Sequence, residues 1–149
     1  MSKAITGGYI PFGAVWTSPT IAEYYNDQTL ACGLTNYGHP LGLAALDAVL
    51  DTLEDSNFQS NKSQLETLFA DTLLPLANKN HVREVRCRGL MAAIYLNHDA
   101  PTWQQGFDAG MHLYGKRNMN ILAPPYISTP EKLENMLSRY IGLLNKSEH

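Results

Sequence analysis

The sequence predicts an α/β protein, and three observations support that prediction. Apolar residues recur every three or four positions in several long segments, which is the helical period. Short apolar runs bounded by Gly and Pro lie between them and are typical of strands. Hydrophobic residues make up 44% of the 149 and charged residues 17%, the balance of a folded globular chain.

The N-terminal part has one lysine, Lys3, shortly before the glycine pair Gly7-Gly8. Residues 10–17 are apolar and rich in strand formers, which predicts a buried strand, and a short helix is expected over residues 20–25. A lone strand needs a sheet to join. We therefore expect a partner segment from the same protein or from another chain.

Two helices are predicted next. Pro40 suits the first turn of a helix, and apolar residues on most of its sides indicate that this helix is buried. Asn61 with Gln64 resembles a capping box at the start of the second helix, which Pro75 kinks or ends.

The C-terminal part alternates strands and helices. Residues 82–96 indicate two strands with a break near Gly89, and residues 121–123 a further short strand. A helix over residues 101–114, capped by Asp99, is expected to bury Trp103 and Phe107. The last helix follows Thr129-Pro130, with an apolar stripe at the helical period.

Composition excludes several classes of function. The net charge is −3 and the 11 Lys and Arg residues are scattered, so no nucleic-acid partner is expected. No apolar run approaches the ~20 residues that span a bilayer, and no signal peptide is apparent, so we expect a cytoplasmic protein without a membrane partner. Cys32 and Cys87 form no CxxC pair and are interpreted as small core residues, and no ligand spacing predicts a metal site.

Three groups of residues are candidates for chemistry. Lys3, at the edge of a glycine loop, can reach a bound carbonyl compound, or it is an ordinary solvent-exposed lysine. Thr35 lies upstream of the helix at Pro40, where its hydroxyl can donate to a phosphate or simply build a turn. His39 is interpreted as a structural helix-terminal residue. A third group of side chains can bind a carboxylate, or form solvated strand charges and ion pairs. This group consists of Arg83, Arg86, Arg88 and Arg117.

Four segments together resemble the class III aminotransferases, the fold-type-I pyridoxal-phosphate (PLP) enzymes that include the omega-amino-acid transaminases. They are KAITGGYIPFGA at residues 3–14, TNYGHP at 35–40, VRCRGLM at 85–91 and NILAPPYIST at 120–129. Their order and spacing agree with the family over essentially the whole chain. The resemblance implies a C-terminal part of such an enzyme, with residues 1–57 ending the large PLP-binding domain and residues 58–149 forming a small α/β domain.

The resemblance also implies roles for residues. Lys3 would bind PLP as the Schiff-base lysine, and Thr35 would contact the PLP phosphate, in this family typically that of the neighbouring subunit. The implied substrates are an amino donor and a 2-oxo acid. The implied partner is a second copy of the chain or a companion chain carrying the upstream domain.

The sequence departs from the family pattern at three places. Cys87 replaces a glycine, and Tyr114 stands where some members have an arginine for the substrate carboxylate. The family's remaining cofactor-binding residues lie upstream of the lysine, so we expect this chain alone to be inactive. Two alternatives stay open: a non-catalytic piece acting in packing or dimerisation, and a relative with other PLP chemistry, such as an aminomutase or decarboxylase.

Overall fold

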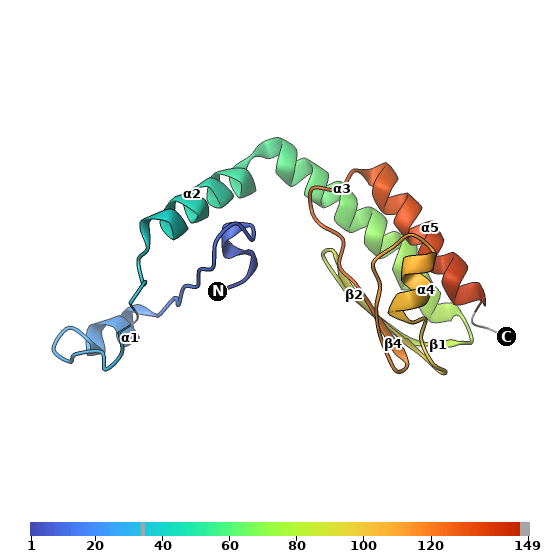
Figure 1. The fold of residues 1–149 in the computed structure, drawn as a ribbon, viewed down its shortest axis with the longest axis horizontal. Coiled ribbons are helices and arrows are strands. Elements are labelled where there is room, and N and C mark those ends of the chain that lie inside the picture. The colour runs from blue at the N-terminus through green and yellow to red at the C-terminus, as the bar shows by residue number, and fades with distance from the viewer. Residues whose placement is uncertain (34, 147–149) are drawn as a thin grey trace. The chain divides into compact units, whose positions relative to one another are not determined.

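The computed structural model describes residues 1–33 and 35–146, and its chain divides into two units, Met1–Asp55 and Ser56–His149. Figure 1 shows the elements of both units along the chain. In the first unit they are a 3-10 turn and two helices: η1 (Ala4–Thr6), α1 (Pro19–Tyr24) and α2 (Pro40–Glu54). Those of the second unit are α3 (Ser56–Leu73), η2 (Leu74–Asn78), β1 (Val82–Arg88), β2 (Met91–Leu96), α4 (Trp103–Asp108), β3 (Tyr114–Lys116), β4 (Met119–Leu122) and α5 (Pro130–Lys146).

The second unit is built on a four-stranded antiparallel sheet in the order β1-β2-β4-β3. The long helices α3 and α5 lie side by side on one face of it (Figure 1). Alternate residues of each strand point to this face, as the strand period requires. In β2 they are Ala92, Ile94 and Leu96, each 1% exposed or less.

The core of this unit is one apolar cluster that encloses a hydrogen-bonded polar pair. Leu65 and Phe69 of α3 and Leu133 and Leu137 of α5 are fully or almost fully buried. Tyr140 and Asn120 are both at 0% exposure, and the Tyr140 hydroxyl donates to Asn120 Oδ1 at 3.3 Å. Burial raises the pKa of Tyr140, because the charged phenolate is poorly solvated there.

The first unit has little core of its own. Among its described residues only Thr6 and Gly42 are buried, while α2 exposes Leu41, Leu43, Leu50 and Leu53. The prediction that this helix is buried is therefore wrong for the chain as described. The strand predicted over residues 10–17 is also wrong: the segment has no regular secondary structure, because no described residue of this unit forms a strand that could supply ladder hydrogen bonds.

Several boundaries in the second unit differ from those predicted. Helix α3 begins at Ser56, five residues before Asn61, whose amide instead donates to the carbonyls of Tyr126 and Ser128. Helix α4 is shorter than expected, and Thr102 caps it with a complete capping box. This shorter helix leaves Trp103 63% exposed and Phe107 70% exposed, so their predicted burial is wrong.

The cysteine prediction holds only in part. Cys87 is half-buried and packs against the core, and burial raises the pKa of its thiol. Cys32 is exposed, so it is not a core residue of the chain.

Candidate active site

The loop that carries Lys3 is closed by hydrogen bonds at its two ends. The Met1 ammonium donates to the Ala14 carbonyl at 2.6 Å, and the Ala14 amide donates back to the Met1 carbonyl at 2.9 Å. Within the loop, the Thr6 hydroxyl donates to the Ile10 carbonyl at 2.6 Å. The Thr6 side chain is fully buried, so this partly buried hydrogen bond is shielded in part from competing water.

Glycines let this loop approach helix α2. Gly7, at φ 61°, ends η1 in the left-handed region, and a Cβ there would stand 3.4 Å from a methyl of Val49. Gly42 lies under the ring of Phe12, where any Cβ would overlap the ring. These two contacts fix the loop against the helix, and with it the backbone of Lys3.

Lys3 has a strained backbone. Its φ of 61° and ψ of −98° lie outside the regions that L-residues usually occupy. Among the described non-glycine residues, only Arg117 shares a positive φ. Strain of this kind costs of order 1–3 kcal/mol and clusters at functional sites, where the surrounding structure holds it. The Lys3 side chain is exposed, so its amine is accessible to a ligand.

The Thr35 segment forms a turn ahead of α2. Thr35 is exposed in the turn of residues 35–38, and Gly38 has φ 66°. His39 is the N-cap of the helix: its Nδ1 accepts from the Leu41 amide at 3.2 Å, which confirms the structural role predicted for it. The N-terminus of the 15-residue helix α2, with the free amides of its first turn, directly follows the turn that carries Thr35.

Lys3 and Thr35 lie on exposed loops of the same unit, and no hydrogen bond in the described part of the chain joins them. Sequence analysis missed the residues that hold the Lys3 loop, namely Thr6, Phe12 and Gly42. A glycine between large apolar residues in a helix was the available signal for Gly42, since such a glycine often marks a close approach.

The arginines of β1 are on the exposed part of the sheet. Arg86 Nε lies 2.7 Å from Glu84 Oε1, and this hydrogen bond lowers the pKa of Glu84. Arg83 and Arg86 both stack over the ring of Tyr95, 5.1 and 5.4 Å from its centroid. The ion-pair alternative is therefore confirmed for Arg86.

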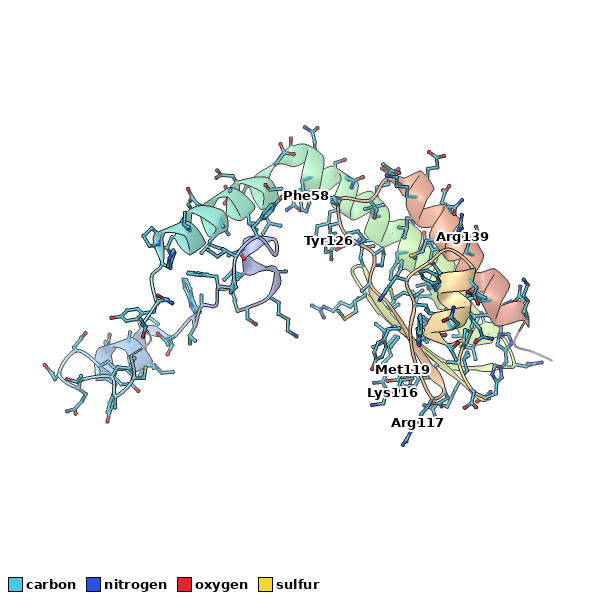
Figure 2. All side chains as sticks on the ribbon, viewed as in Figure 1. Phe58, Lys116, Arg117, Met119, Tyr126 and Arg139 are labelled. Atoms are coloured by element: carbon cyan, nitrogen blue, oxygen red, sulfur yellow. The ribbon has the colours of Figure 1, made fainter. Side chains whose placement is uncertain are left out.

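Arg117 is at the tip of the β3–β4 hairpin, next to Lys116, and Figure 2 shows both side chains at that end of the sheet. Its φ of 53° lies at a turn position where glycine is preferred. In residues 1–33 and 35–146, no three metal-ligating side chains gather into a cluster. Within the same residues, no helix combines the length and apolar character needed to cross a bilayer.

Comparison with known families gives one match over nearly the full chain. The profile described as "Aminotransferase class-III" matches residues 1–143. The chain is 30% identical over 141 residues to the ornithine aminotransferase of Staphylococcus carnosus, covering 93% of this chain and 35% of that protein. It is 31% identical over 150 residues to an omega-aminotransferase of Caulobacter vibrioides, covering 92% of this chain and 34% of that protein.

Solved structures share the fold. A taurine:2-oxoglutarate aminotransferase from Bifidobacterium kashiwanohense, in complex with PLP and glutamate, superposes with a TM-score of 0.85 at 28% identity, covering 97% of this chain and 36% of that chain. A PLP-bound amine transaminase from an uncultivated Pseudomonas species gives a TM-score of 0.83 at 30% identity, covering 97% of this chain and 37% of that chain. The predicted α/β fold of fold type I is confirmed. The chain spans about a third of the length of the relatives it matches.

Proposed function

The chain belongs to the class III aminotransferase family, and from that premise we propose that it is the C-terminal segment of a PLP-dependent aminotransferase. The parent enzyme would transfer an amino group from an amine or amino acid to a 2-oxo acid. The observation that supports this most directly is Lys3, an exposed amine on a strained backbone, held by a buried threonine and by glycine contacts to α2.

Lys3 is proposed as the Schiff-base lysine, and as the group that accepts and returns a proton at the substrate Cα. PLP, when bound, supplies the electron sink for this chemistry. The residues present fit such a group. Gly8 has φ 83° and open space where a Cβ would stand, so a planar ring can come close to the backbone of the loop that carries Lys3.

Thr35 is proposed to donate its hydroxyl to the cofactor phosphate. Its position in the turn before a long helix favours an anion, because the helix N-terminus carries partial positive charge. The phosphate is proposed to be that of a neighbouring subunit, which makes a homodimer, or a companion chain with the upstream domain, the expected assembly. A cytoplasmic location is part of the same proposal.

The chain alone is proposed to be inactive, because it spans only about a third of the length of its relatives. A second candidate is a role in packing alone. The large apolar residues of the first unit favour it, since Tyr9, Val15 and Trp16 are each at least 87% exposed.

The test is borohydride reduction of the chain with PLP, followed by mass mapping of the lysines. The main proposal expects a pyridoxyl group on Lys3 in excess over Lys116, an exposed lysine of the second unit. Equal labelling of the two lysines would remove the cofactor role. A stable dimer without labelling at Lys3 would favour the packing role. Robust transamination by the chain alone would contradict the proposal that it is inactive.

A further inference from the structure

A second site is present in the second unit, at the β3 edge of the sheet. A cavity of about 590 Å³ opens there between α5, the segment of residues 110–114 and the segment of residues 121–125. Its floor is made by Met111, Leu122 and Leu133, all of which are buried. Neither Lys3 nor Thr35 belongs to this unit.

The polar lining of this cavity has one sign of charge. Lys132 and Arg139 of α5 line it together with His112, whereas none of the described residues that line it carries a carboxylate. Lys132 and Arg139 are seven positions apart, so they lie on the same side of α5. Cations concentrated in a concave site with apolar walls attract anions more strongly than the same cations on an open surface.

Arg139 is held in place by three hydrogen bonds. Its Nε donates to Asn135 Oδ1 at 2.7 Å, and its Nη1 donates to the carbonyls of Ala109 and Gly110 at 2.9 and 3.3 Å. Gly110 has φ 74°, and a Cβ there would collide with Arg139 Nη1, so glycine is required for this approach. Figure 2 shows Arg139 on α5. A fixed guanidinium loses little conformational entropy when it binds an anion.

We propose that this cavity binds a small carboxylate with an apolar body. The carboxylate would lie between Lys132 and Arg139, and the body would rest on Leu133 and Met136. The half-buried side chain of Met136 distinguishes this ligand from a bare inorganic anion, which would leave that side chain in contact with water.

The test uses benzoate as the probe and benzamide as its neutral control, with binding to the 149-residue chain measured by calorimetric titration. Benzoate is expected to bind, more weakly at higher salt, and benzamide at least about ten-fold more weakly, as the loss of a charge-assisted contact implies. Lys132→Met is expected to weaken benzoate binding by up to about five-fold, the range for an exposed ion pair. Lys116→Met removes a lysine outside the cavity and should have no effect.

Lys132 is exposed, so its replacement leaves the core intact, and circular dichroism checks the fold of each variant. Absence of benzoate binding, equal affinity for benzoate and benzamide, or equal effects of Lys132→Met and Lys116→Met would each overturn the proposal. Benzoate binding and pyridoxyl labelling of Lys3 are separate measurements. Loss of the cofactor role and loss of this site are therefore separable results.

Discussion

The Tyr140 hydroxyl and the Asn120 amide form a hydrogen-bonded pair across the interface between α5 and the sheet, and neither side chain is exposed. Asn120 Nδ2 also donates to the Pro101 carbonyl at 2.8 Å, so the amide links a helix, a strand and a loop. A buried polar group is costly when its partner is removed.

Tyr140→Phe is expected to lower the free energy of unfolding by about 1–3 kcal/mol, because Asn120 Oδ1 would lose its donor in a place without water. Urea unfolding followed by circular dichroism measures the change. Tyr114→Phe is the control, since Tyr114 is 50% exposed and should cost little. Similar losses for the two variants would show that the pair contributes nothing specific.

Stability is expected to fall at alkaline pH through the same residue. Burial raises the pKa of Tyr140 above the ordinary value of about 10. Above that value the unfolded chain releases the phenolic proton while the folded chain retains it, so the unfolded state binds fewer protons and stability falls as pH rises. Between about pH 8 and about pH 11, the free energy of unfolding should therefore fall more steeply with pH for the wild type than for Tyr140→Phe. Denaturant unfolding at each pH measures it.

Arg117→Gly is expected to raise the free energy of unfolding by up to about 1 kcal/mol, because glycine adopts φ 53° without steric cost. Lys116→Gly, at the neighbouring strand position, should lower it by roughly 0.5–1 kcal/mol. Chemical denaturation of both variants checks the opposite signs. A loss of stability in both variants would mean that the Arg117 side chain outweighs its backbone strain.

Gly42→Ala is expected to displace Phe12, because the added methyl would overlap the ring. The displacement should loosen the loop that holds Lys3 and lower pyridoxyl labelling at that residue. Gly142→Ala is the matched control: its Cβ would meet no atom within 4 Å. That change should leave labelling intact and stabilise α5 by up to about 1 kcal/mol. Unchanged labelling in Gly42→Ala would contradict the idea that α2 positions Lys3.

Much of the second unit could be predicted from the sequence, because its helices and strands find their partners within the chain. The hydrophobic stripe of α5 places Leu133, Leu137 and Tyr140 in the core as expected. The β1–β2 hairpin was predicted with its break near Gly89, since glycine readily adopts the φ of 56° found there. The helix predicted over residues 101–114 runs past the end of α4 at Asp108 to Tyr114, the first residue of β3, because Met111 and Tyr114 continue the apolar pattern.

The first unit was harder to predict, since its local pattern reflects partners outside the described contacts. Residues 10–17 have strand composition, but no described residue of their unit forms a strand. Helix α2 is covered only in part: Gly42 is buried and Val49 is half-buried, whereas Leu41, Leu43, Leu50 and Leu53 are exposed. The roles of Lys3 and Thr35 stay predictions that follow from the family resemblance. The buried hydrogen bond from Thr6 that holds the lysine loop was not predictable, because it depends on loop geometry rather than on periodicity.

The uneven burial of the two units bears on calorimetry. Heat is absorbed on melting when packed side chains separate, and Met1–Asp55 has almost none to separate. The melting enthalpy of the whole chain should thus approach about 60 kcal/mol near 60 °C, the value for roughly 90 residues rather than for the full length. The excess length would appear only as a sloping baseline.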